Sequence, residues 1–206
     1  MLVRSCGAEP AVHSSVFVAP TAVLVGRVWV DERSRVMYGA VLDSEGSKVE
    51  IGVCTIVCEN AVLRGTSSGD TDHPVLVGDH VLVGPHATLL GCTVEPYSYV
   101  ATSATILHGA TVRSGAVVAV GALVHARAVV PSGFFVPPNT VAIGDPVELY
   151  GADDKEALAE AIRSLGFVKS AFGLEPNWED RTATYREATE VRSKEFERHF
   201  EDIVLS

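Results

Sequence analysis

The sequence predicts a three-sided parallel β-solenoid over residues 1–150, followed by a helical tail over residues 151–206. Two observations predict the solenoid: aliphatic residues recur with a period of six, and the residue four positions after most of them is alanine or threonine. A third observation separates the tail. Of the 33 valines, 30 precede residue 151, whereas the 42 charged residues divide equally, 21 to each part. A β-rich body and a charged helical tail fit this change in composition.

Each hexad is expected to form one flat side and one corner, so that three hexads make one coil. The aliphatic residue points into a narrow core, and the small residue fits the corner, where a larger side chain would clash. A sandwich or barrel is the alternative, because residues 75–84 also alternate with a period of two. The long run of hexads favours the solenoid. Its aliphatic positions are Val18, Leu24, Val30, Val36, Leu42, Ile51, Val57, Leu63, Val77, Val83, Leu89, Val94, Val100, Ile106, Val112, Val118, Val124, Val130 and Val136.

The tail is predicted to contain two helices. The first can be capped by Asp153 or Asp154, and Gly173 is a suitable stop. The second, at about residues 178–200, is charged and weakly amphipathic. We expect the tail to pack along the solenoid and to cover one apolar side. The first helix has its apolar residues at helical spacing, at Leu158, Ile162, Leu165 and Phe172.

Charge and composition exclude several classes of protein. The 206 residues carry a net charge of −10, which argues against nucleic acid and anionic membranes as partners. No apolar run approaches the ~18 residues that a membrane span needs, and the first ten residues lack the apolar core of a signal peptide. Four cysteines do not make a disulfide scaffold in a chain of this length. We therefore predict a cytoplasmic protein.

Stacking of the coils predicts which polar residues are neighbours. With three hexads per coil, the aliphatic residues that precede Asp43, Arg64 and Leu90 fall into one column, so these three residues fall into the next column. Adjacent rungs of such a solenoid lie ~4.8 Å apart. Asp43 and Arg64 are therefore expected to lie side by side and to form an ion pair.

The segment 66–76, TSSGDTDHPVL, is too long for a corner and should protrude from the same edge of the solenoid. It carries Asp70, Asp72 and His73. Protruding loops commonly line binding and catalytic sites, so this segment is expected to border any site at the Asp43–Arg64 edge.

Four stretches carry a resemblance to a known family: VLDSEGSKVEIG, IGVCTIVCENAVLRG, HPVLVG and VGPHATLLGC. In this order they resemble the gamma-class carbonic anhydrases, which are hexapeptide-repeat proteins, over roughly residues 10–175. The resemblance implies a left-handed β-helix and a homotrimer. It also implies a site between subunits at which three histidines, two from one chain and one from a neighbour, bind zinc or iron.

The residues at the three ligand positions of this family are different here. Carried over residue by residue, the positions hold Arg64, Pro85 and Leu90. Arginine stays protonated, and proline and leucine have no donor atom on the side chain. Because the family's chemistry depends on metal-bound water, we predict no metal, no cofactor and no CO2 hydration.

The residues that support the family's site are changed as well: the arginine and aspartate of its polar turn are Asp43 and Glu45 here, and its glutamine is Cys58. We therefore predict that the cleft between subunits binds or transforms a small organic molecule by metal-free acid–base chemistry. Glu45 or a neighbouring chain's His86 would carry the proton, and Arg64 would hold an anion. The cleft would further be lined by Asp43, Cys58, His73, Pro85, Leu90 and Tyr99.

Three alternatives stay open at this stage. The first is a hexapeptide-repeat acyltransferase with His86 or His73 as the base, although the tail lacks a basic patch for the phosphates of coenzyme A. The second is a non-catalytic trimeric scaffold. The third is a shifted metal site that uses His73 and His86. Against this last alternative, His86 follows Pro85, and consecutive side chains of a strand point in opposite directions.

Overall fold

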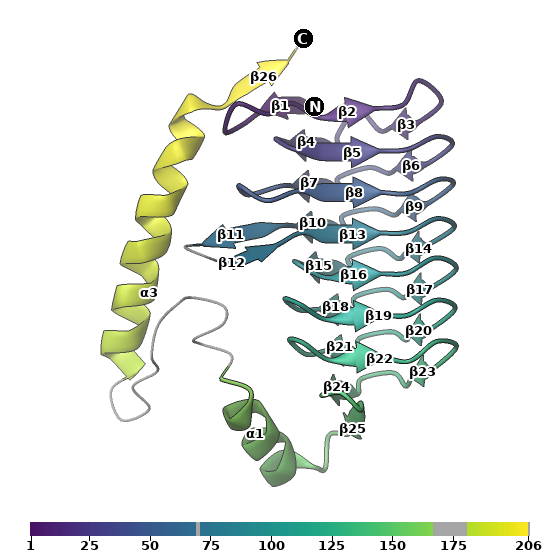
Figure 1. Cartoon of the computed structure of the whole chain (residues 1–206), viewed down its shortest axis with the longest axis vertical. Coiled ribbons are helices and arrows are strands. Elements are labelled where there is room, and N and C mark those ends of the chain that lie inside the picture. Colours follow the sequence, from purple (N-terminus) through teal and green to yellow (C-terminus); the bar gives the residue numbers. More distant parts are fainter. Residues whose placement is uncertain (69–70, 167–180, 206) are drawn as a thin grey trace.

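The computed structural model of the chain describes residues 1–68, 71–166 and 181–205, with side chains for all of these except Ser68 and Arg181 (Figure 1). Its body is a parallel β-helix with three flat sides around one apolar core. The predicted fold class, a left-handed parallel β-helix of hexapeptide repeats with a C-terminal α-helix, is confirmed.

The longest side, which we call side A, is a sheet of ten strands. Its strands pair in parallel, except that β25 and β26 run antiparallel to β24 and β1 at the two ends. In spatial order they are β25 (Glu148–Tyr150), β24 (Val141–Ile143), β21 (Leu123–Val124), β18 (Thr105–Ile106), β15 (Thr88–Leu90), β10 (Val62–Arg64), β7 (Val41–Asp43), β4 (Val23–Val25), β1 (Leu2–Arg4) and β26 (Ile203–Leu205).

The other two sides are parallel sheets of seven strands each. Side B consists of β2 (Ala11–Val12), β5 (Val28–Val30), β8 (Val49–Ile51), β13 (Val75–Val77), β16 (Thr93–Val94), β19 (Thr111–Val112) and β22 (Val129–Val130). Side C consists of β3 (Phe17–Val18), β6 (Arg35–Val36), β9 (Ile56–Val57), β14 (Leu82–Val83), β17 (Tyr99–Val100), β20 (Val117–Val118) and β23 (Phe135–Val136). The chain passes through sides C, A and B in turn.

The core of the solenoid consists of the aliphatic residues that recur once in each hexad. All of the predicted aliphatic positions are buried except Val18, which is partly buried and packs against the core. Leu42, Leu63 and Leu89 lie in register on neighbouring strands and are fully buried. Burying one such side chain stabilises the fold by about 1.5–3 kcal/mol. The small residues at the corners, such as Ala61, are buried as well.

The segment predicted to protrude is a β-hairpin at the corner between sides A and B. β11 (Thr66–Ser68) pairs antiparallel with β12 (Thr71–His73). Figure 1 shows the hairpin projecting from the body toward helix α3. Asp70 lies outside the described residues. The protrusion is thus confirmed, and it consists of two strands rather than an irregular loop.

The tail differs from its prediction in several places. Helix α1 (Lys155–Ser164) has Asp154 at its N-cap, but the Asp154 carboxylate accepts a hydrogen bond from the Gly151 N–H (2.7 Å) and not from the helix. The helix ends well before the predicted stop, because Gly166 adopts a positive φ of 58°. Phe172, Gly173 and Trp178 lie outside the described residues. None of the described helices is long and apolar enough to cross a bilayer.

The second tail segment forms helix α3 (Arg181–Phe196) and the 3₁₀ helix η1 (Glu197–Glu201). Figure 1 shows α3 alongside the body, leading back to β26 beside β1. β26 was not predicted; it extends side A by pairing antiparallel with β1. The end of α3 and η1 contact charged residues at the corner between sides A and B, which the sequence did not predict. That the tail covers an apolar side stays a prediction.

Candidate functional site

Three charged residues at the corner between sides A and B form one cluster, which we call the charge corner: Asp43, Glu45 and Arg64. β7 ends at Asp43, β10 ends at Arg64, and the two residues are register partners on neighbouring strands. The Arg64 Nε atom lies 3.7 Å from Asp43 Oδ2. The predicted ion pair is therefore present. On the next strand, Leu90 is the register partner of Arg64, also as predicted.

Glu45 lies in the turn that connects β7 to β8. Its backbone has a positive φ of 42°, and its N–H donates a hydrogen bond to Asp43 Oδ1 (2.9 Å). This turn directs the Glu45 side chain into the corner, where only 1% of it is exposed. Arg64 Nη2 donates to Glu45 Oε2 at 2.6 Å.

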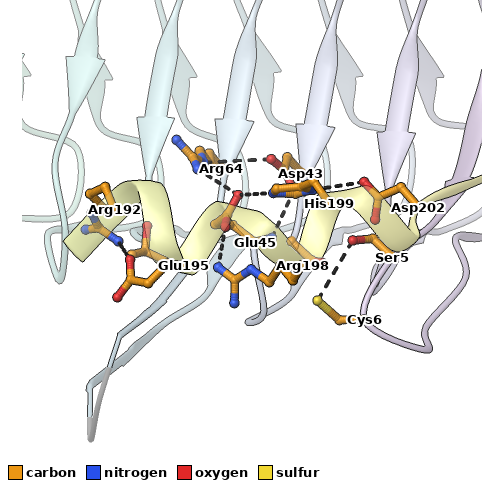
Figure 2. A network of polar contacts seen from close by, with 12 residues as sticks. Ser5, Cys6, Asp43, Glu45, Arg64, Arg192, Glu195, Arg198, His199 and Asp202 are labelled. Carbon is orange, nitrogen blue, oxygen red and sulfur yellow. Dashed lines mark hydrogen bonds and ion pairs between the residues drawn. The ribbon is translucent and has the colours of Figure 1, made fainter. Parts of the chain in front are cut away.

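The tail supplies the other partners of Glu45 (Figure 2). The Arg198 guanidinium donates to Glu45 Oε1, and His199 Nε2 lies 3.2 Å from Oε2. The other ring nitrogen of His199 lies 2.8 Å from Asp202 Oδ2. The buried carboxylate of Glu45 is thus surrounded by three nitrogen-bearing side chains, two of which come from the tail.

The tail also covers the Arg64 side chain. The guanidinium carbon of Arg64 lies 5.1 Å from the ring centroid of Phe196, the last residue of α3. A cation above an aromatic ring at this distance is stabilised by the charge distribution of the ring. In the single chain, the corner at which the sequence predicts a cleft between subunits is covered by the chain's own tail.

The pKa of Glu45 follows from these partners. Burial alone would raise it, but the hydrogen bonds from Arg64 and Arg198 outweigh burial and hold the pKa at about 2. Glu45 is therefore a carboxylate at neutral pH while the tail is docked. Burial raises the pKa of the neighbouring Asp43, against the hydrogen bond from the Glu45 N–H. The proton-carrier role of Glu45 stays a prediction that requires departure of the tail.

A pair of histidines lies at the same corner: His73 ends the hairpin that follows β10, and His108 follows β18, two strands beyond β10. The ring centroids of His73, at the end of β12, and His108 are 5.6 Å apart, with the rings edge to face. His108 Nε2 lies 3.4 Å from Thr66 Oγ1. Burial, reinforced by electrostatic repulsion from the neighbouring His73 and Arg192, lowers the pKa of His108 to about 4, so its imidazole is neutral at pH 7.

Sequence reasoning missed His108, although a signal was available. His108 follows the buried Ile106 by two residues, and Ile106 is the register partner of Leu89. His108 therefore had to lie at the same corner as Arg64, and the hairpin brought His73 to it. The prediction had joined His73 with His86 instead.

The remaining predicted site residues lie elsewhere on the chain. Cys58, Pro85 and His86 are at the corner between sides C and A, where His86 is exposed and has a positive φ of 58°. Tyr99 is on β17 with its side chain on the outer face of side C, and is 38% exposed. These residues and the charge corner lie at opposite ends of the side A strands. Only contact between two chains can bring them together, so their joint role stays a prediction.

The charge corner does not fit a metal ion. Both oxygens of Glu45 are engaged by cationic or imidazole groups, and the guanidinium of Arg64 has no lone pair to donate. Over the whole described part of the chain, no three histidine, cysteine, aspartate or glutamate side chains are grouped so as to hold a metal ion. The absence of a metal in the protein stays a prediction.

Known proteins are similar to part of this sequence. Gamma carbonic anhydrase 1, mitochondrial, from Arabidopsis thaliana is 38% identical over 103 residues, which are 48% of this chain and 37% of that protein. The resemblance to the gamma carbonic anhydrases is confirmed. Gamma carbonic anhydrase-like 2, mitochondrial, from the same plant is 38% identical over 89 residues, 42% of this chain and 35% of that protein. The chain thus spans little more than a third of the length of these curated relatives.

A shorter relative and one solved structure extend the comparison. A probable carbonic anhydrase from Methanocaldococcus jannaschii is 33% identical over 95 residues, 46% of this chain and 57% of that protein. No protein-family profile matches the chain. The crystal structure of a hexapeptide transferase family protein from Anaplasma phagocytophilum superposes with a TM-score of 0.56 at 20% identity, over 94% of this chain and 97% of that one. This last likeness shows the fold alone. The plant relatives are named as mitochondrial, so the predicted cytoplasmic location is not confirmed.

Proposed function

We propose that the chain is a gamma carbonic anhydrase-like protein that has lost metal-dependent CO2 hydration, and that its charge corner binds or transforms a small organic molecule without a metal. The observation that carries the proposal is the Arg64–Glu45 ion pair at a family ligand position. A guanidinium bonded to a buried carboxylate leaves this position with a fixed cation in place of a metal ligand.

The charge corner offers polar groups that a ligand can use. In the described part of the chain, the buried Nε of Arg64 has no hydrogen-bond acceptor. A buried donor without a partner is costly, so an anionic or carbonyl oxygen of a ligand would be stabilised there. Departure of the tail removes the Arg198 hydrogen bond from Glu45 and raises the pKa of Glu45. Glu45 then becomes a better base, in keeping with the proposed acid–base chemistry.

We also propose that the protein is a homotrimer in which His86 of one chain approaches the charge corner of its neighbour. Apolar side chains on the outer face of side C support contact with another chain, because a row of exposed apolar side chains is typical of an interaction surface. They are Phe17, Ile56, Leu82, Tyr99 and Phe135, each between 38% and 55% exposed. A cytoplasmic location and the absence of a nucleic acid partner complete the proposal.

A non-catalytic trimeric scaffold is the second candidate. The observation that favours it is the docked tail, which engages Glu45 and covers Arg64. An acyltransferase is less well supported, because the likeness to a hexapeptide transferase family protein shows the fold alone. Binding of a coenzyme A thioester discriminates between the acyltransferase and the other two candidates.

Ligand-observed NMR with a panel of small carboxylates, amines and one acyl-coenzyme A tests the proposal. We expect a compound that binds the wild type at one site per chain and is lost in Arg64→Gln. Arg113→Gln is the matched control, because Arg113 is exposed and lies at the corner between sides B and C. Binding that survives Arg64→Gln, or a panel without any ligand, would favour the scaffold. CO2 hydration by the wild type above the buffer rate would contradict the proposal outright.

A further inference from the structure

The turn Glu45–Gly46 holds a guanidinium group that belongs to the tail. Arg198 donates to Glu45 Oε1, as Figure 2 shows. Gly46 has a positive φ of 78°, and a Cβ atom built on it would lie 2.8 Å from Arg198 Nη1. A side chain at position 46 would therefore displace the end of the Arg198 side chain. The buried carboxylate and the missing side chain together shape the space around one planar cation.

The Glu45–Gly46 turn is fixed more firmly to the solenoid than the tail segment that carries Arg198. Glu45 is fixed by its hydrogen bond to Asp43 and by the ion pair with Arg64, both on adjacent strands of side A. In contrast, η1 has no buried residue, and Phe200 is 91% exposed. The β26 strand that follows pairs over three residues only. Segments with little apolar burial open at low free-energy cost, so the site is preformed and its occupant can leave.

When the tail is absent, the net charge of the charge corner determines which kind of ligand group can take the place of Arg198. Asp43 and Glu45 contribute two negative charges and Arg64 one positive charge, so the corner carries a net charge of −1. Departure of Arg198 leaves Glu45 Oε1 without its donor. The carboxylate then remains beside the Arg64 cation with one oxygen open to a new donor, and a guanidinium is the cation whose planar N–H groups match a carboxylate.

We propose that the Glu45–Gly46 turn is a binding site for the guanidinium group of a ligand, and that Arg198 of the chain's own tail occupies this site in the structure. The inference rests on the proposed function and names the group that the Glu45 end of the charge corner would bind: the guanidinium of an alkylguanidinium compound. The guanidinium can come from a free small molecule or from Arg198 of a second copy of the chain.

Ethylguanidinium at millimolar concentration is the probe, and ethylammonium at equal ionic strength is the control. We expect Arg198→Ala to bind one ethylguanidinium per chain, at least about tenfold more tightly than the wild type, whose own Arg198 competes. The double variant Arg198→Ala/Glu45→Gln should not bind it. In the Arg198→Ala background, Gly46→Ala should weaken binding, because its Cβ occupies the space of the guanidinium.

The wild type provides a second readout that does not depend on the folding of a variant. Saturating ethylguanidinium should increase amide hydrogen exchange in residues 181–205, and ethylammonium should not. If neither Arg198→Ala nor the wild type responds to ethylguanidinium, or if the double variant still binds it, the inference is wrong. A ligand without a guanidinium that depends on Arg64 but not on Glu45 would likewise overturn it and leave the proposed function intact.

Light scattering on the same samples distinguishes the two sources of guanidinium. If Arg198 binds the turn of a second copy, Arg198→Ala should lower the oligomer mass, and ethylguanidinium should lower that of the wild type. An unchanged mass together with binding identifies a free small molecule as the ligand.

Discussion

Substitution of Glu45 by glutamine should weaken the docking of the tail and leave the solenoid intact. Glutamine keeps the size of the side chain but removes the charge that faces Arg64, Arg198 and His199. Arg64 keeps its contact with Asp43 on the neighbouring strand. The two tail residues lose the carboxylate that holds them, so the effect should appear in the tail and not in the coils.

The pKa of Glu45 gives the size of the free energy that this carboxylate contributes to docking of the tail. Each tenfold change in proton affinity is worth about 1.4 kcal/mol, so a pKa that falls from 4.5 to about 2 corresponds to a total on the order of 3 kcal/mol. Arg64 supplies part of this total and stays in place when the tail leaves. The share of Arg198 and His199 is therefore about 1–2 kcal/mol, or roughly tenfold in the equilibrium between docked and undocked tail. Because the pKa is lowered on folding, this stability is complete above pH 4.5 and is lost as the pH falls toward 2.

Hydrogen exchange resolved by residue is the suitable assay. At pH 7, the amides of residues 181–205 should lose about tenfold in protection in Glu45→Gln, and those of β7 and β10 should not. At pH 3 the difference between wild type and variant should be smaller than at pH 7, and it should fall further as the pH approaches 2 and Glu45 becomes protonated in the docked state as well. Glu50→Gln is the control, because Glu50 pairs with Lys48 on the exposed surface and should leave the tail unaffected. Equal tail protection in wild type and Glu45→Gln at pH 7 would refute the reasoning.

Two further predictions concern the pH dependence of tail docking and the stability of the core. Burial opposes the charged form of His199, but its hydrogen bonds to Asp202 and Glu45 outweigh burial and raise its pKa. The tail should therefore be held most firmly below pH ~6.5 and loosen as the pH rises through the raised pKa; His199→Ala should remove this dependence of tail exchange on pH. Leu63→Ala removes a fully buried side chain from the centre of the solenoid and should lower the free energy of unfolding in urea by about 2–5 kcal/mol; a loss below 1 kcal/mol would contradict the assigned register.

The sequence alone was sufficient for the body because neighbours in a solenoid follow from counting. Once the hexads assign Leu42 and Leu63 to one column, the residues after them must be adjacent, and the register of Asp43 with Arg64 confirms this. The same counting places Leu90 on the next strand. Each of these register pairs joins two residues in consecutive coils of the solenoid.

The tail contacts could not be predicted in this way. No repeat relates Arg198 or His199 to Glu45, which lies more than 150 residues earlier in the chain. The charged face of η1 resembles any solvated helix, and three apolar residues at 203–205 are too few to indicate a strand. The tail partners of the charge corner therefore depend on tertiary packing, which the pattern of the sequence does not determine.

Metal content per chain, measured by mass spectrometry on protein purified without chelator, tests the central claim most directly. The account predicts far less than one zinc or iron per chain, because the resemblance assigns Arg64, Pro85 and Leu90 to the family's ligand positions. As a positive control, the triple variant Arg64→His/Pro85→His/Leu90→His should gain metal if these positions are correctly assigned. Stoichiometric metal in the wild type would contradict the account and would make His73 and His108 the first residues to replace.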